Sequence, residues 1–158
     1  MLIRNPSARV NASLLGLNDS QAEAFYAALT RKVAIIQGPP GTGKSYITTK
    51  LVQALLQNGD MRKTGRQSDP IIIICYTNNA LDQLLEKFVD FTTNFVRVGS
   101  QCESEKLIPY RLKTIKEKRR KQSDLQIYRT MDIIGFTVTG AIMRKDDLDR
   151  LHPKISMI

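Results

Sequence analysis

At 158 residues the chain is long enough for one compact domain with a hydrophobic core. Its 42% hydrophobic and 25% charged residues are ordinary for a globular protein, but a formal net charge of +9 is not. An excess of that size favours partners that carry phosphate, nucleic acid first and an anionic membrane surface second. A solvated basic surface explains the total charge equally well, so the distribution of charge along the chain has to decide.

Cysteine and hydropathy patterns exclude several classes of protein. Cys75 and Cys102 are the only cysteines, too few for a disulfide framework or a cysteine zinc site. No segment is apolar enough for a secretory signal or a membrane span, so no membrane association is expected. The sequence therefore predicts an intracellular protein, cytoplasmic or nuclear.

The first third of the chain predicts helix, strand, glycine loop and helix. Residues 1–16 show no clear period, and a helix is predicted to begin at Asn18. The apolar residues 33–37 predict a short buried strand that runs into Gly38. A second helix is predicted from Lys44, with Ile47, Leu51 and Leu55 on one face.

After a polar loop at residues 60–69 the alternation continues. The run Ile-Ile-Ile-Ile-Cys at 71–75 is typical of a central parallel strand covered on both faces. The remaining predicted elements are a helix over 81–89, strands at 95–98 and 132–136, a helix over 141–151 and a strand at 154–158. Strands that alternate with helices predict an α/β fold with a doubly wound parallel sheet.

Residues 103–131 interrupt this alternation with a concentration of positive charge. Nine Lys or Arg side chains stand against four carboxylates, which gives the segment a net charge of +5. We interpret it as a mostly exposed basic helix, or helical arm, inserted into the sheet domain. A solvated charged face is an alternative of equal weight.

Residues 38–45 match the pattern G-x-x-x-x-G-K-[ST] at every fixed position. Glycines allow backbone N–H groups to approach a phosphate, and the N-terminus of the following helix favours the same anion. Lys44 is predicted to reach the β- and γ-phosphates of ATP, and the Ser45 hydroxyl to ligate Mg²⁺. These two are the catalytic candidates. The predicted nucleotide-binding loop comprises Gly38, Pro39, Pro40, Gly41, Thr42, Gly43, Lys44 and Ser45.

Four segments around and after this loop resemble, in order, the motifs of superfamily 1 helicases. Residues 17–21 resemble the Q motif and residues 75–85 resemble motif Ia; residues 96–99 and 134–141 resemble later segments of the same motor domain. The subgroup with the greatest resemblance is that of the nonsense-mediated-decay helicases, and within it the helicases that also carry zinc fingers of the NF-X type. The resemblance covers residues 13–158 and implies a P-loop NTPase with a RecA-like sheet.

The resemblance also implies roles for individual residues. Gln21 would contact the adenine of ATP; its alternative role is in a capping box with Asn18. Thr77 and Asn78 would contact the backbone of single-stranded RNA or DNA. An ordinary helix N-cap is the alternative there, and both roles could hold together. Thr137 and Gly140 would add a second backbone contact.

Two departures from the family pattern affect the expected activity. Members of the subgroup carry an accessory domain where this chain has only the basic residues 103–131. The paired acids of motif II, which would follow the strand at 154–158, are not within these 158 residues, and neither is the second RecA-like domain. We therefore expect a single truncated RecA-like ATP-binding domain that binds ATP weakly and hydrolyses it poorly or not at all.

Three functions remain open at this point. The first is part of an ATP-dependent helicase, a nucleic-acid-stimulated ATPase. The second is a module that binds nucleotide and RNA without turnover. The third is a P-loop ATPase unrelated to nucleic acid, against which the motif Ia resemblance argues.

Overall fold

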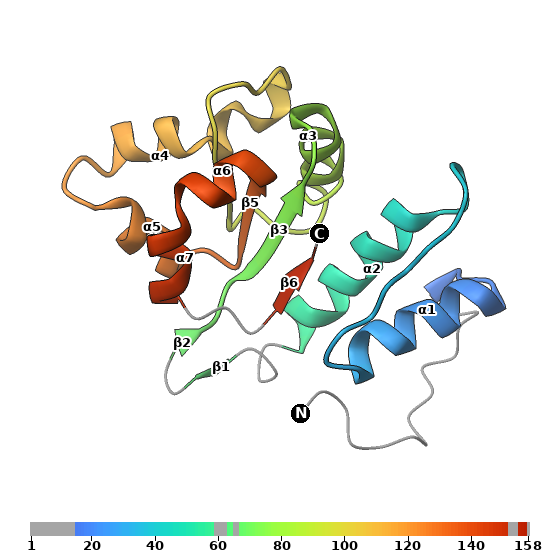
Figure 1. Ribbon diagram of the computed structural model, residues 1–158. Coiled ribbons are helices and arrows are strands. Elements are labelled where there is room, and N and C mark those ends of the chain that lie inside the picture. Colours follow the sequence, from blue (N-terminus) through green and yellow to red (C-terminus); the bar gives the residue numbers. More distant parts are fainter. Residues whose placement is uncertain (1–14, 59–62, 65–66, 152–154, 158) are drawn as a thin grey trace. The chain divides into compact units, whose positions relative to one another are not determined.

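The computed structural model describes residues 15–58, 63–64, 67–151 and 155–157 (Figure 1). These residues belong to two compact units, one within residues 1–61 and one within residues 62–158. Each unit has its own secondary structure and is described by itself below. No helix within the described residues is long and apolar enough to cross a membrane.

The first unit contains two helices, α1 (Asp19–Thr30) and α2 (Lys44–Gln57). Helix α1 begins after Asn18, as predicted, because the Asn18 side chain accepts a hydrogen bond from the Gln21 amide. Helix α2 begins at Lys44, as predicted, and buries the expected stripe together with one further residue: Ile47, Leu51, Val52 and Leu55.

The strand predicted at residues 33–37 is wrong. These residues form no strand, and the side chains of Val33 and Ile35 are 78% and 89% exposed. A strand is stable only when a neighbour pairs with its N–H and C=O groups. Residues 15–58 contain helices and loops but no strand that could supply this pairing. An apolar sequence alone was therefore not sufficient to predict a strand here.

The second unit contains a four-stranded sheet in the order β4-β5-β3-β6, and every pair of neighbours is parallel. The strands are β3 (Ile71–Cys75), β4 (Phe95–Arg97), β5 (Ile133–Thr137) and β6 (Ile155–Met157). All four predicted strands of this region are confirmed: β3 has the predicted ends, and the ends of β4 and β5 differ by one residue. Residues 154 and 158, the predicted ends of the last strand, lie outside the described residues. Strand β3 is interior, between β5 and β6, as its apolar run predicts. The predicted α/β class with a parallel sheet is confirmed.

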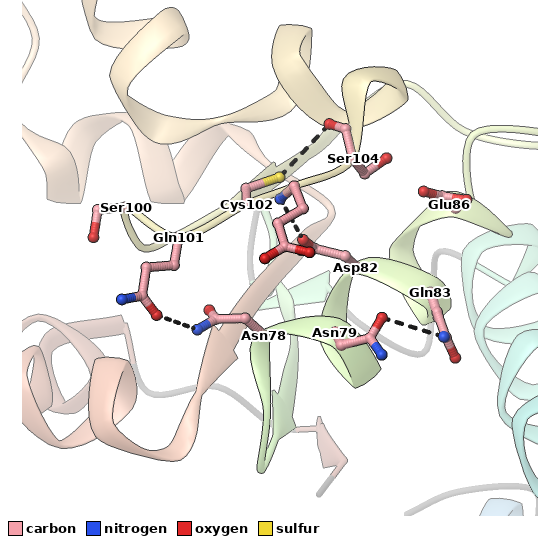
Figure 2. Close-up of a pocket in the computed structure, with 10 residues that line it drawn as sticks. Asn78, Asn79, Asp82, Gln83, Glu86, Ser100, Gln101, Cys102 and Ser104 are labelled. Atoms are coloured by element: carbon pink, nitrogen blue, oxygen red, sulfur yellow. Dashed lines mark hydrogen bonds between the residues drawn. The ribbon is translucent and has the colours of Figure 1, made fainter.

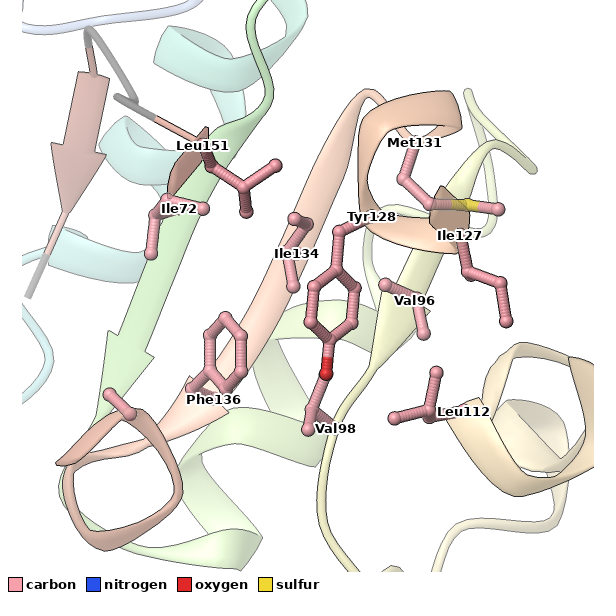
Figure 3. Packing of buried hydrophobic residues seen from close by; sticks show 11 residues of the cluster. Ile72, Val96, Val98, Leu112, Ile127, Tyr128, Met131, Ile134, Phe136 and Leu151 are labelled. Carbon is pink, nitrogen blue, oxygen red and sulfur yellow. The ribbon is translucent and has the colours of Figure 1, made fainter. Parts of the chain in front are cut away.

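One face of the sheet packs against a cluster of buried hydrophobic residues (Figure 3). Ile72, Val96 and Ile134 project from three neighbouring strands onto this face. Tyr128 covers them, and its ring meets Phe136 edge-on, with 6.0 Å between centroids. The remaining buried members come from the covering segments and strand ends: Val98, Leu112, Ile127, Met131, Ala141 and Leu151.

Helix α3 (Asn78–Glu86) packs on the opposite face. Gly135 of β5 lies directly beneath it, and a Cβ there would approach Cδ1 of Leu85 to 2.8 Å and Cδ1 of Leu81 to 3.1 Å. The absence of a side chain at Gly135 thus permits close contact between helix and sheet. The predicted helix over 81–89 is confirmed, although it begins earlier and ends at Glu86.

The basic segment is more closely packed than a single exposed arm. It forms a 3₁₀ helix, η3 (Glu105–Tyr110), and two helices, α4 (Leu112–Lys118) and α5 (Asp124–Thr130). Leu107, Ile127 and Tyr128 are fully buried. Several apolar residues of the segment therefore belong to the core, whereas Ile108 is 44% exposed. Most of its charged side chains are exposed, and Arg111 and Asp124 are partly buried.

Two further differences concern short elements. The predicted polar loop contains a small antiparallel ladder between β1 (Lys63–Thr64) and β2 (Gln67–Ser68). The predicted helix over 141–151 is two helices, α6 (Val138–Met143) and α7 (Lys145–Leu151). Helix α6 starts directly after β5 because Thr137 caps it.

Candidate functional site

The predicted nucleotide-binding loop has the backbone geometry that its glycines allow. Gly41 and Gly43 adopt φ angles of 82° and 87°, which residues with a side chain rarely adopt. Gly43 is the N-cap of α2, so the loop runs directly into the helix N-terminus. The first amides of that helix therefore adjoin the loop, as an anion-binding site at a helix N-terminus requires.

The Lys44 side chain folds back over the loop. Its Nζ donates hydrogen bonds to the carbonyl oxygens of Gly38, at 2.7 Å, and Pro39, at 2.8 Å. The Thr42 hydroxyl donates to the same Pro39 carbonyl at 2.9 Å. The Lys44 ammonium is thus held at the centre of the loop, where a phosphate oxygen could replace a carbonyl as its partner.

Gln21 connects α1 to this loop, a contact that sequence reasoning missed. Its Nε2 donates to the Thr42 carbonyl at 3.0 Å, while its Oε1 accepts from the Asn18 amide at 3.2 Å in a capping box. A Cβ at Gly43 would lie 2.6 Å from the same Nε2. The alternative role of Gln21 is therefore present, and Gln21 also positions the loop. A contact with adenine stays a prediction.

Ser45 lies in the first turn of α2 and is exposed, so its hydroxyl is accessible to a cation bound beside the loop. A hydroxyl of this kind suits Mg²⁺, which prefers oxygen ligands and retains several waters. Within the described part of the chain, no group of three or more His, Cys, Asp or Glu side chains could hold a metal by itself. Ser45 is compatible with Mg²⁺ as one ligand among ligands from the nucleotide.

The structure brings the four predicted nucleic-acid contacts together at one edge of the sheet. Cys75 of β3 and Thr137 of β5 are direct neighbours in the parallel register, so the turns that follow both strands share the carboxyl edge. Thr77 Oγ1 accepts a hydrogen bond from the Ala80 amide at 3.1 Å, and Thr137 Oγ1 accepts from the Gly140 amide at 3.2 Å. Both threonines are therefore N-caps, which confirms the alternative role of Thr77.

Asn78 is held in place by the side chain of Arg97 on β4, and this side chain is fully buried. The Arg97 guanidinium donates to Asn78 Oδ1 at 2.8 Å, to Asp82 Oδ1 at 2.9 Å and to the Gln101 carbonyl. Asn78 Nδ2 in turn donates to Gln101 Oε1 at 3.0 Å. Arg97 thus fixes the first turn of α3 and the loop after β4, and its role was missed in the sequence. The available signal was a cation within the apolar run Phe-Val-Arg-Val.

A pocket of ≈ 710 Å³ lies beside α3 and the loop after β4 (Figure 2). Asp82, Glu86 and Glu103 contribute carboxylates to its lining, and Asn78, Gln83 and Gln101 contribute amides. Asp82 is partly neutralised by Arg97, and its Oδ2 accepts from the Glu103 amide at 3.2 Å. A pocket with this lining would repel phosphate, so we do not assign nucleotide binding to it.

A glycine loop that runs into a helix N-terminus and a parallel α/β sheet are the features of a P-loop NTPase. The sequence matches the family described as "AAA domain" over residues 16–149, and the chain belongs to that family. The resemblance to superfamily 1 helicases of the nonsense-mediated-decay type is confirmed by similar proteins.

NFX1-type zinc finger-containing protein 1 of Homo sapiens is 44% identical over 127 residues, 80% of this chain and 7% of that protein. Helicase required for RNAi-mediated heterochromatin assembly 1 of Schizosaccharomyces pombe is 38% identical over 58% of this chain and 9% of its own length. ATP-dependent helicase upf1 of the same yeast is 37% identical over 56% of this chain and 9% of its own length. The chain thus spans less than a tenth of each of these relatives.

Replacing Arg97 by methionine should destabilise the fold strongly. The substitution leaves the buried Asp82 carboxylate without its cation, and breaking a buried ion pair from one side costs about 3–5 kcal/mol. Urea unfolding of the wild type and Arg97→Met measures this loss. Arg97→Lys keeps the charge but cannot donate to all three acceptors, so its free energy of unfolding should lie between those of the wild type and Arg97→Met.

A double-mutant cycle with Asp82→Asn tests whether the pair itself is responsible. Each single variant should lower the free energy of unfolding. We expect the decrease in the double variant to be smaller than the sum of the two single decreases by at least about 1 kcal/mol, because the two groups are in direct contact. Strict additivity would show that the pair with Asp82 is not responsible and that Arg97 acts through its other contacts.

Proposed function

We propose that this chain is part of the first motor domain of an ATP-dependent helicase, where it binds ATP with Mg²⁺ and single-stranded RNA or DNA. The observation that carries the proposal is the position of Lys44, held over the loop carbonyls at the N-terminus of α2. In this proposal residues 1–158 form one RecA-like ATP-binding domain, and a second RecA-like domain completes the motor.

The nucleotide site uses the loop in three ways. Lys44 exchanges carbonyl partners for β- and γ-phosphate oxygens, which as anions accept stronger hydrogen bonds. The loop amides and the N-terminus of α2 bind the same phosphates. Ser45 supplies one oxygen ligand to Mg²⁺, and the bound cation neutralises phosphate charge. Gln21 contacts Thr42 and is therefore near enough to contact a base bound beside the loop.

The nucleic-acid site is the carboxyl edge of the sheet, formed by Thr77, Asn78, Thr137 and Gly140. Two strands in direct register place both threonines at this edge, each beside the first amides of a helix. Hydroxyls and backbone amides of this kind bind phosphate oxygens without selecting a sequence. Tyr76, 87% exposed, adds an aromatic ring, and aromatic rings stack with bases in many single-strand-binding proteins.

A non-catalytic module that binds nucleotide and RNA is the second candidate. Among the described residues, no carboxylate directly follows strand β3, β4 or β5 at the carboxyl edge. Asp146, Asp147 and Asp149 lie on α7 instead. Mg²⁺-assisted phosphoryl transfer needs groups that hold the cation and orient the attacking water, so ATP hydrolysis is the observation that separates the two candidates.

ATP binding should depend on Lys44. Lys44→Ala should weaken the binding of a fluorescent ATP analogue by about 1.5–3 kcal/mol, the contribution of a charge-assisted contact. Lys32→Ala, which removes an exposed cation from the same unit, is the matched control and should leave affinity unchanged. Equal affinity of Lys44→Ala and the wild type would exclude the phosphate-loop assignment.

Single-stranded RNA binding should depend on the electrostatics of the carboxyl edge. The variant Thr77→Asp with Thr137→Asp keeps both helix caps but opposes each phosphate with a carboxylate, at a cost of about 1 kcal/mol each. Relative to Thr77→Asn with Thr137→Asn, we expect affinity to fall by about tenfold to thirtyfold in fluorescence anisotropy.

The control for net charge adds two carboxylates at positions that are not part of the carboxyl edge. Gln57→Glu at the end of α2 and Thr93→Asp before β4 change two exposed positions. We call Thr77→Asp with Thr137→Asp the aspartate pair. If the control variant loses as much affinity for RNA as the aspartate pair does, the carboxyl edge is not the binding surface.

The 158-residue chain is expected to bind ATP with little or no turnover. Phosphate release is measured with and without single-stranded RNA, beside Lys44→Ala and beside a longer polypeptide that includes the second RecA-like domain. Only the longer polypeptide should show RNA-stimulated, Lys44-dependent release. Rapid Lys44-dependent release by the 158-residue chain would identify a complete ATPase of another kind.

A further inference from the structure

The turn that joins α4 to α5 carries four consecutive cations. Lys118 ends α4, Arg119 is its C-cap, and Arg120 and Lys121 follow. All four side chains are exposed. We call residues 118–121 the basic turn.

Contacts on both sides hold the basic turn in one position. Helix α4 is anchored by Leu112, which is buried, and α5 by Ile127 and Tyr128, which belong to the same hydrophobic cluster (Figure 3). Arg119 Nη1 donates to Thr130 Oγ1 at 2.9 Å, which closes the turn across the two helices. A capping box between Ser123 and Gln126 fixes the start of α5. The cations are therefore presented by a packed element.

The nearby carboxylate does not neutralise this charge. Asp124 is shared between Lys116, whose Nζ lies 2.7 Å from Oδ1, and Arg144, which donates to Oδ2. Burial raises the pKa of Asp124, but the hydrogen bonds from Lys116 and Arg144 outweigh burial and lower it, so the carboxylate stays ionised and paired. Glu117 is the only acid from 113 to 123, so the basic turn keeps a strong excess of positive charge.

Fold stability does not account for two of these cations, Arg120 and Lys121. Lys116 and Lys118 lie in the last turn of α4, where positive charge complements the helix dipole. Arg120 and Lys121 lie beyond that helix and just before the N-terminus of α5, where the dipole disfavours positive charge. Four adjacent like charges also repel one another. An external anion would offset this repulsion.

We propose that the basic turn binds the phosphate backbone of single-stranded nucleic acid, as a contact separate from the carboxyl edge of the sheet. The proposal takes from the proposed function only the class of ligand. Residues 118–123 contain no apolar side chain that could insert into a bilayer, as peripheral membrane binding would require. Cations that displace condensed counterions from a polyphosphate need no apolar partner.

The test neutralises the basic turn without breaking it. Lys118→Gln, Arg120→Gln and Lys121→Gln are combined in the 158-residue chain, and Arg119 is kept because it holds Thr130. Binding of single-stranded RNA and DNA of mixed sequence is measured over a range of salt concentrations. We expect the slope of log K against log salt to become shallower by as much as about 2, that is about 0.7 for each lost contact.

Two variants act as controls. Lys32→Gln, Lys87→Gln and Lys145→Gln lower the net charge equally at exposed positions elsewhere, and should keep the wild-type slope. Lys118→Arg, Arg120→Lys and Lys121→Arg keep the charge and should also keep the slope. An unchanged slope in the neutralised variant, or an equal change in the charge-matched control, would overturn the proposal.

Competition separates nucleic acid from other anions. Polyglutamate and phosphatidylserine vesicles, at equal total charge, should displace RNA poorly; displacement as effective as by unlabelled RNA would overturn the proposal.

The aspartate pair at Thr77 and Thr137 distinguishes the two nucleic-acid surfaces. A flattened slope in the neutralised variant supports the basic turn even if the aspartate pair binds normally, and in that case only the carboxyl-edge assignment fails.

Discussion

The second unit depends on one buried guanidinium. Arg97 is fully buried, and its guanidinium donates hydrogen bonds to acceptors supplied by α3 and the loop after β4. Desolvating a cation is costly unless its hydrogen bonds and charge are satisfied, so these acceptors have to stay where they are. Gly99, at φ 122°, leaves room for the side chain, because a Cβ there would lie 2.6 Å from Arg97 Nη1. The position of α3, and with it of the carboxyl edge, follows from this network.

Local patterns were sufficient to predict the elements of the sheet and the loop. The isoleucine run of β3 can be buried on both faces only in a covered parallel sheet. Gly41 and Gly43 allow the positive φ angles that the loop adopts. The helix starts at Asn18 and Lys44 were predictable for the same reason, since caps and glycines act over a few residues. Such signals do not depend on distant parts of the chain.

Features that depend on distant partners could not be predicted. Residues 33–37 have the composition of a strand, but composition does not supply a pairing neighbour. Arg97 finds Asp82, Asn78 and the Gln101 carbonyl through the fold, and no spacing rule connects these residues. The basic segment was interpreted from its charge, while its placement follows from a few apolar side chains such as Leu107 and Tyr128. In each of these three cases, contacts between residues far apart in the sequence determine the local structure.

Capping and ligand binding draw on the same chemistry at both candidate sites. Thr77, Thr137 and Gln21 satisfy backbone groups at helix ends. Amides in the first turn of a helix are also the groups that can bind a phosphate. A cap uses one side-chain oxygen and one amide, so the other amides of that turn stay available. Lys44 likewise combines a structural contact with a free charge, because its carbonyl partners hold the ammonium in place without neutralising it. An anionic oxygen is a stronger acceptor than a carbonyl, and a loop already closed around its lysine needs little rearrangement to receive a phosphate.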